Sequence, residues 1–125
     1  MDEETFKTRT KQLALRVMRL IESLPRKKAA DLIGRQLLRS AMSVGANYRA
    51  ACRGKSVADV VTKLKIVEEE SDETVYWLEL LVEGGIIPAE KLKNLTAEAN
   101  EIVAMTVASI KTLRARQKPI ANQKA

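Results

Sequence analysis

The chain has 125 residues, with 22 Lys and Arg against 16 Asp and Glu, no His and a net charge of +6. This length suits one domain with a sizeable core. A 46% hydrophobic content with only 5 Gly, 3 Pro and 3% aromatic residues favours long helices and argues against a β-sandwich. The single cysteine, Cys52, excludes an intrachain disulfide and fits a reducing compartment.

The N-terminal residues and the apolar runs argue against a secretory signal and a membrane span. The first ten residues, MDEETFKTRT, are acidic and lack the apolar segment of a secretory signal. The unbroken apolar runs are only a few residues long, too short to span a bilayer. We therefore expect a cytoplasmic protein with no membrane contact.

The first two predicted helices cover residues 3–23 and 27–52. Pro25 separates them, and so short a link implies antiparallel neighbours. Gly54 should end the second helix. Apolar residues spaced by three and four define the buried side of each helix. These are Phe6, Leu13, Val17, Leu20 and Leu24 in the first, and Ala30, Ile33, Leu37, Ala41, Val44, Tyr48 and Ala51 in the second.

The third and fourth helices follow with clear boundaries. Ser56 and Asp59 form an N-cap pair, Gly84-Gly85 is a stop signal, and Pro88 suits the first turn of the fourth helix. Their predicted buried positions are Val57, Val60, Val61, Leu64, Val67, Ser71, Thr74, Val75, Leu78 and Leu81, then Leu92, Leu95, Ala99, Ile102, Thr106, Ile110 and Leu113.

These four segments predict an all-α protein, an antiparallel up-down-up-down four-helix bundle over residues 1–116. Residues 117–125, QKPIANQKA, contain little to bury, and we predict a disordered basic tail.

Charge is distributed unevenly. Residues 25–55 contain eight basic and one acidic side chain, whereas residues 56–87 contain two basic and eight acidic ones. One interpretation is a set of ion pairs between adjacent helices of one subunit. The other is a basic face that meets the acidic face of a second subunit, which supports a head-to-tail ring.

The second helix is predicted to have three faces. At about 100° per residue, four arginines fall within roughly 80° of one another, opposite the apolar side; they are Arg35, Arg39, Arg49 and Arg53. Lys55 lies just beyond them, and Gln36, Ser40, Ser43 and Asn47 form a polar stripe between the two sides. Guanidinium groups suit phosphates and carboxylates equally, so nucleic acid and a neighbouring acidic helix both remain candidates for the arginine face.

One motif in this helix resembles a known family. Arg39, Ser43 and Asn47 match the RxxxSxxxN signature of the four-helix bundle proteins encoded in intervening sequences of bacterial 23S ribosomal RNA genes. Glu73 and the apolar run before Gly84-Gly85 support the resemblance, which spans residues 5–115. The family usually has Glu-Gly where this chain has Ala50-Ala51, and Gly-Ser where it has Glu69-Glu70.

The resemblance implies a four-helix bundle that assembles into a ring-like homopentamer. A relative in fold is the accessory protein of diversity-generating retroelements, which resembles a basic pentamer that binds a reverse transcriptase and RNA. The resemblance therefore implies self-association, with structured RNA or a nucleic-acid-binding protein such as a reverse transcriptase as a partner.

The polar residues invite more conservative interpretations as well. Ser40, Ser43 and Asn47 could bond a ligand, but such groups more often satisfy each other or a neighbouring backbone. Tyr48, Tyr76 and Trp77 lie among the seam residues and are interpreted first as core or interface anchors.

The sequence gives little support for a catalytic site or a metal site. Glu70 with Glu73, and Glu98 with Glu101, have the spacing of bundle carboxylate sites, but those sites also need histidine, which the chain lacks. Without histidine, no Ser-His or Cys-His pair can form. Cys52 lies close in sequence to Arg53 and Lys55, whose charges could lower its pKa, although a packing role is more usual. No nucleotide-binding glycine motif is present, and we predict no cofactor.

The leading hypothesis is a non-enzymatic homo-oligomer whose basic face binds structured RNA, or a complex of nucleic acid and protein, through charge and shape. The candidate contacts are Arg35, Arg39, Arg49, Arg53, Lys55, Lys111, Arg114 and Arg116, with Lys118 beyond them. The alternative is a protein-protein adaptor whose arginine face is used in subunit contacts, with no nucleic-acid binding.

Overall fold

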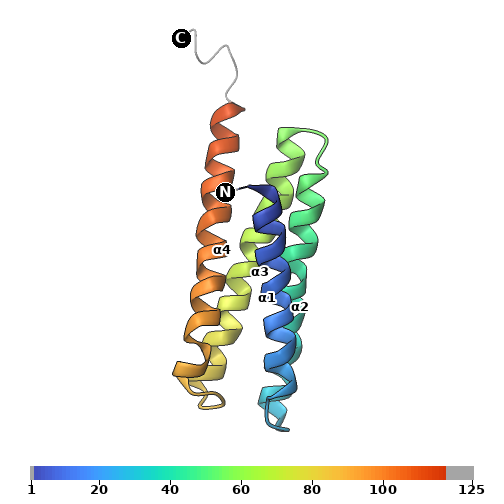
Figure 1. Cartoon of the computed structure of the whole chain (residues 1–125). Helices are drawn as coiled ribbons and strands as arrows, with labels where there is room; N and C mark the ends of the chain where they lie inside the picture. The colour runs from blue at the N-terminus through green and yellow to red at the C-terminus, as the bar shows by residue number, and fades with distance from the viewer. Residues whose placement is uncertain (1, 118–125) are drawn as a thin grey trace.

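The computed structural model describes residues 2–117, and these form four long helices connected by short links (Figure 1). The helices are α1 (Glu3–Glu22), α2 (Lys28–Cys52), α3 (Val57–Glu83) and α4 (Ala89–Arg116). They run alternately up and down, as the sequence predicts, and no strand occurs among the described residues. The predicted tail lies, apart from Gln117, outside the described residues.

Local chemistry explains where the helices begin and end. Asp2 and Ser56 are N-caps whose side chains accept hydrogen bonds from the backbone N–H of Thr5 (2.7 Å) and Asp59 (3.1 Å). Pro88 is the N-cap of α4, with extended backbone, so the predicted position in the first turn is wrong by one residue. Its ring still sets the chain direction just before the helix starts at Ala89.

Two links require glycine. A Cβ on Gly54, between α2 and α3, would lie 2.4 Å from a methyl carbon of Val60. Gly85, between α3 and α4, has a φ of 71°, a left-handed conformation that side chains with a Cβ rarely adopt. These two positions let the chain reverse within a few residues, as the sequence predicted.

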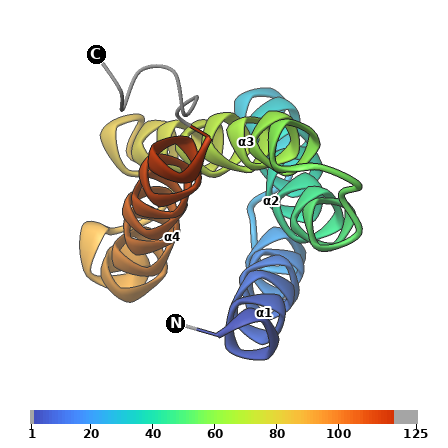
Figure 2. The ribbon, with the colours of Figure 1, turned by 90° about the horizontal axis from the view of Figure 1, so that it is seen from above.

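The helices form an open arrangement when seen along the bundle axis (Figure 2). α2 packs against α3, α3 against α4 and α1 against α2, whereas α1 and α4 touch least. α1 and α2 approach closely at Gly45, where a Cβ would lie 3.5 Å from the backbone carbon of Thr10, an ordinary van der Waals contact.

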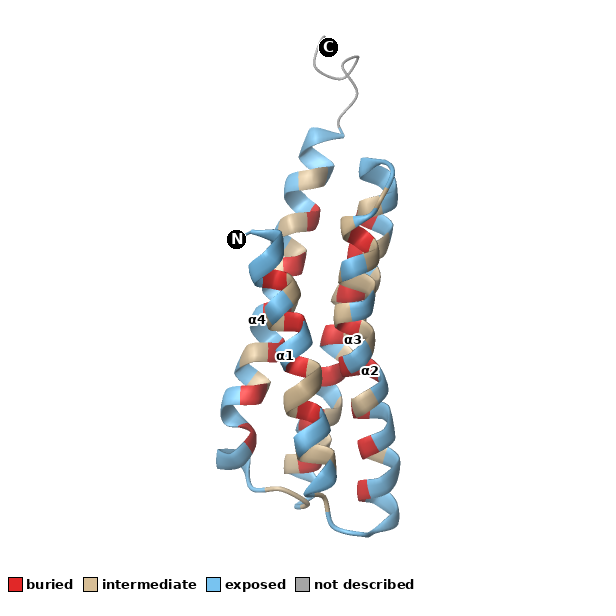
Figure 3. Ribbon diagram, turned by 45° about the vertical axis from the view of Figure 1, so that its right-hand side comes forward, coloured by how far each residue is buried: buried red, intermediate tan, exposed pale blue. Residues whose placement is uncertain are grey.

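The buried side chains form inward stripes on every helix (Figure 3). The larger hydrophobic cluster draws on all four helices and includes Leu13, Leu37, Leu78 and Ile102, each without solvent exposure. A smaller cluster of Ala51, Val61, Leu64 and Ile110 lies where α2 ends and α3 begins. The predicted buried stripes are confirmed with one clear exception, Val57, which is exposed because it is the first residue of α3 and precedes the core.

The lengths of the helices make the two ends of the bundle different. α1 has 20 residues and α4 has 28, which corresponds to about 30 Å and 42 Å at 1.5 Å per residue. In Figure 1, the last turns of α4 and the link between α2 and α3 extend past the start of α1. One end of the molecule is therefore built from three helices, with no α1 beside them.

Candidate nucleic-acid interface

Basic side chains gather at the three-helix end. Arg49, Arg53 and Lys55 come from the end of α2 and the following link, and α4 ends at the same end of the bundle with Lys111, Arg114 and Arg116. Arg49 is at the border of this end, where it lines a pocket with Glu4 and Lys7 of α1. All six residues are exposed. We call this set of six the basic end. Within residues 2–117, none of the six has a carboxylate within ion-pair distance, so their charges face solvent.

Two further lysines lie toward the same end of the bundle. Neither is among the candidate contacts predicted from the sequence. Lys63 and Lys65 lie in the first turns of α3, just after the link that carries Lys55. Asp59 is the nearby acid in sequence, and its carboxylate accepts a hydrogen bond from the backbone N–H of Lys55 (3.1 Å). Basic residues in the last turns of α2 and α4 also stabilise those helices through the macrodipole. That effect does not account for lysines at the start of α3.

Arg35 and Arg39 have the predicted angle around α2, but they lie farther from this end of the helix. Arg35 is 18 residues before Arg53 on the same helix, a separation of about 27 Å along the axis. Its guanidinium lies 3.5 Å from the Asp31 carboxylate. The periodicity gave the angle around the helix correctly, but the four arginines divide into two groups at different heights.

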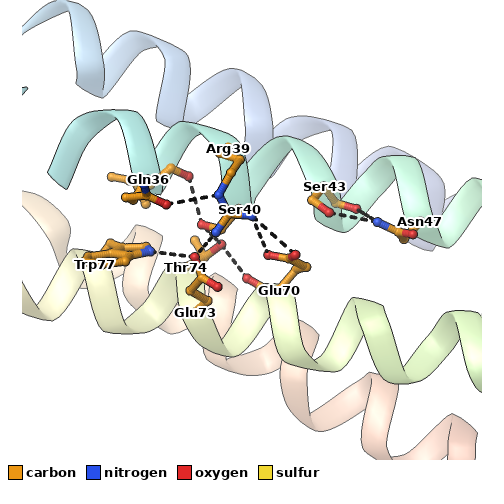
Figure 4. A network of polar contacts seen from close by, with 10 residues as sticks. Gln36, Arg39, Ser40, Ser43, Asn47, Glu70, Glu73, Thr74 and Trp77 are labelled. Carbon is orange, nitrogen blue, oxygen red and sulfur yellow. Dashed lines mark hydrogen bonds and ion pairs between the residues drawn. The ribbon is translucent and has the colours of Figure 1, made fainter. Parts of the chain in front are cut away.

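Arg39 is held by two carboxylates of α3 (Figure 4). Its Nη1 lies 3.3 Å from Oε2 of Glu70, and its Nη2 pairs with Glu73. Its Nε donates to Oε1 of Gln36 (3.1 Å). Burial lowers the pKa of the guanidinium, but the negative charges of Glu73 and Glu70 outweigh this and raise it overall. Arg39 therefore serves to join α2 and α3, as the interpretation of ion pairs within one subunit proposed.

The remaining motif residues also bond within the chain. Trp77 Nε1 donates to the same Glu73 oxygen (2.9 Å), and Asn47 Nδ2 donates to Oγ of Ser43 (2.8 Å) and to its carbonyl (2.9 Å). Ser40, without solvent exposure, donates to the Leu37 carbonyl and accepts from Oγ1 of Thr74 on α3 (3.0 Å). Within the polar stripe, Ser40 therefore links α2 to α3, whereas the bonds between Asn47 and Ser43 lie within α2 (Figure 4).

The second pair of glutamates holds another arginine, one that sequence reasoning missed. Arg9 of α1 donates from Nε and Nη2 to Glu98 (3.0 and 2.6 Å), and Nη2 also lies 3.0 Å from Glu101. These hydrogen bonds raise the pKa of the Arg9 guanidinium. The interaction ties α1 to α4, which pack least closely among the pairs of helices in contact. Residues 89 positions apart carry no sequence signal for such a contact.

Cys52 and the aromatic residues match their predicted environments only in part. Burial raises the pKa of the Cys52 thiol, which fits the preferred interpretation of Cys52 as a packing residue. Tyr48 is half-buried and stacks on Phe6 with ring centroids 4.5 Å apart. Tyr76, predicted among the seam residues, is 52% exposed beside Trp77. Only Tyr48 and Trp77 therefore contribute to packing within the chain, and Tyr76 presents its ring to solvent.

The helices, their short links and the intrachain use of Arg39, Glu73, Ser43 and Asn47 define an all-α four-helix bundle protein. The chain belongs to the family of 23S rRNA-intervening sequence proteins, whose family model matches residues 4–108. The family resemblance predicted from the motif is thereby confirmed.

A solved structure has the same fold. It is a protein of unknown function from the S23 ribosomal protein family of Bacteroides thetaiotaomicron VPI-5482, 33% identical in sequence, with a TM-score of 0.82. The match covers 89% of this chain and 99% of that one. No curated protein matches the chain. Within residues 2–117, none of the helices is both long and apolar enough to cross a membrane.

Proposed function

We propose that this protein is a non-enzymatic RNA-binding bundle that contacts structured RNA through its basic end. The observation that carries the proposal is that six exposed cations lie at one end of the molecule, and none of them has a carboxylate within ion-pair distance among the described residues. Phosphates are the natural counter-charge for such a cluster, and contacts to them give affinity without reading sequence. The exposed aromatic ring of Tyr76 lies on the acidic helix α3, so stacking on single-stranded bases is not expected at this end.

The structure narrows the set of residues that the sequence proposed. Arg39 is engaged by Glu70 and Glu73, and Arg35 lies beside Asp31. Their removal from the RNA surface leaves Arg49, Arg53, Lys55, Lys111, Arg114 and Arg116 as the proposed contacts. The RNA class that fits is structured RNA, because helical RNA is recognised mainly through its shape and its phosphates, which exposed cations on a bundle can contact.

Fluorescence anisotropy with a structured ribosomal RNA fragment, titrated over salt, tests the proposal. The basic-end variant replaces Arg53 and Arg114 with Gln, and the control variant replaces Arg26 and Lys91, exposed cations at the opposite end, with Gln. Removing one phosphate contact should reduce the log-log salt slope by about 0.7–0.9. We expect this reduction only in the basic-end variant. Absence of RNA binding at low salt, or equal slopes in both variants, would exclude the proposed surface.

A second function, self-assembly into an adaptor ring, is favoured by a different surface. Leu32 and Met42 are 65% and 48% exposed on the α2 face that also carries Arg35, and apolar groups beside an arginine are typical of subunit interfaces. This function predicts that light scattering finds an oligomer and that Leu32→Glu dissociates it. A monomer at micromolar concentration would exclude it. The two functions are compatible, since they use different parts of the molecule.

A further inference from the structure

A groove opens at the three-helix end, next to the basic end. Its floor is formed by Val60 and Leu64 of α3, one wall by α2 and the other by α4. Glu3, in the first turn of α1, closes it below. The wall residues are Tyr48, Ala51 and Cys52 on α2, and Met105, Ala108, Ser109, Thr112, Leu113 and Arg116 on α4. The groove is therefore the interior of the bundle, uncovered where α1 has not yet begun.

The shape of the groove matches one face of a short helix. Its α4 wall runs from Met105 to Arg116, which spans about 16 Å or three helical turns. Its volume is about 600 Å³, and its apolar floor overlies the smaller hydrophobic cluster. In a four-helix bundle, this is the position of the fourth helix. A helix that continued the line of α1 would cover the floor as α1 covers the larger cluster.

The charges around the groove select an acidic helix. Arg116 lines it, and Arg53, the C-cap of α2 next to the lining residue Cys52, flanks the end of the other wall. Lys111 and Arg114 are about 140° and 160° around α4 from Arg116, so they lie on the far side of that helix. The carboxylate among the lining residues, Glu3, lies 3.2 Å from Lys7, which offsets its charge. The chain's own acidic helix, α3, buries its apolar face within the bundle and cannot serve. The occupant must come from another molecule.

From this geometry, we infer that the groove binds an amphipathic, acidic helix of a partner protein, with its apolar face on Val60 and Leu64 and its carboxylates toward Arg53 and Arg116. Helix-in-groove recognition uses apolar side chains spaced by three and four residues. The inference goes beyond the proposed RNA binding and does not depend on it.

Two peptides of 14 residues test the inference with the full-length protein. One carries Leu on one face and Glu on the other, and the second has Lys in place of every Glu. Binding is measured by anisotropy of labelled peptide, and occupancy of the groove by the rate at which iodoacetamide alkylates Cys52 at pH 8.5. We expect the Glu peptide to bind at least tenfold more tightly and to slow the alkylation of Cys52, which lines the groove.

Two variants locate the peptide. Ala108→Glu adds a negative side chain to an exposed position in the α4 wall, and Ala58→Glu makes the same change on an exposed position of α3, about 160° around the helix from Val60. We expect Ala108→Glu to weaken binding of the Glu peptide at least tenfold and Ala58→Glu to leave it within twofold. Equal affinity of both peptides, no binding, no protection of Cys52, or equal effects of the two variants would overturn the inference. RNA titrations of the same variants report separately on the proposed function.

Discussion

The four-helix part of the bundle and the three-helix end differ in how much apolar surface they enclose and in whether their charged side chains are paired. In the four-helix part, the large cluster is enclosed and the arginines Arg9 and Arg39 are each held by two glutamates. At the three-helix end, the smaller cluster borders an open groove, and none of the six cations has a carboxylate within ion-pair distance among the described residues. We therefore expect the first region to contribute most of the stability, and we propose the second as the region that binds a partner.

The largest expected difference in stability is between two variants in which the same change, Leu→Ala, is made in each of the two regions. Leu78→Ala removes a side chain with no exposure from the large cluster, and Leu64→Ala removes one from the groove floor. Leu→Ala changes in cores cost about 2–5 kcal/mol, more where the cavity cannot collapse or fill with water. We expect Leu78→Ala near the upper limit and Leu64→Ala near the lower one. Urea unfolding measures both, and a larger loss of stability for Leu64→Ala would contradict the comparison.

The next largest difference is expected between Arg9 and Arg39, the two arginines that are each paired with two glutamates. Their substitution should lower the free energy of unfolding by different amounts. Arg9 has a side chain 25% exposed and Arg39 one that is 48% exposed. Hydrogen bonds to charged groups contribute about 1.5–3 kcal/mol when shielded, whereas exposed ion pairs contribute about 0–1 kcal/mol. We therefore expect Arg9→Met to lower the free energy of unfolding more than Arg39→Met, measured at low and high salt. Equal decreases in both variants would mean that the α1–α4 contact is less important than its geometry indicates.

A smaller effect, on the pH dependence of stability, is expected from Cys52. Because burial raises the pKa of its thiol, the folded protein keeps the proton to higher pH than the unfolded chain does. This contribution to stability is fully present below the pKa of the unfolded thiol and is lost as pH rises through the folded pKa. We expect iodoacetamide to modify Cys52 more slowly than glutathione at pH 8, and Cys52→Ser to flatten the fall in stability at alkaline pH. Modification as fast as that of glutathione would show an activated thiol instead.

The smallest effect is expected at the contact between α1 and α2. A Cβ on Gly45 would lie 3.4 Å from Oγ1 of Thr10, which is close but sterically allowed. Replacing a helical glycine by alanine stabilises a helix by about 1 kcal/mol, and this gain should offset the crowding. We expect Gly45→Ala to change the free energy of unfolding by less than about 0.5 kcal/mol, and Gly45→Leu to destabilise the protein clearly. Tolerance of leucine would show that the helices are less tightly packed here.

The fold was largely predictable because its signals are local. Pro25, Gly54, Ser56 and Gly84-Gly85 mark the links, and spacing by three and four residues identifies the buried stripes. Val57 was misassigned because periodicity does not show where along a helix the core begins. The motif of Arg39, Ser43 and Asn47 lies within the region that the family model matches, and Arg39 pairs with Glu73 of the neighbouring helix.

The candidate site was less predictable, because periodicity gives an angle around one helix and no distance to another. Arg35 and Arg53 share an angle on α2 but not an end of the bundle, and Arg39 meets its partners across 31 and 34 residues. The groove depends on the late start of α1 relative to α4, a difference in height that only the assembled bundle reveals.

The central claim is that the unpaired cations of the three-helix end form the RNA-binding surface. Its most direct test is the salt slope of RNA affinity for wild type, for Arg53→Gln with Arg114→Gln, and for Arg26→Gln with Lys91→Gln, which remove the same charge. The account predicts a slope reduced by about 1.4–1.8 in the first variant and a wild-type slope in the second. Equal slopes in all three proteins would contradict it.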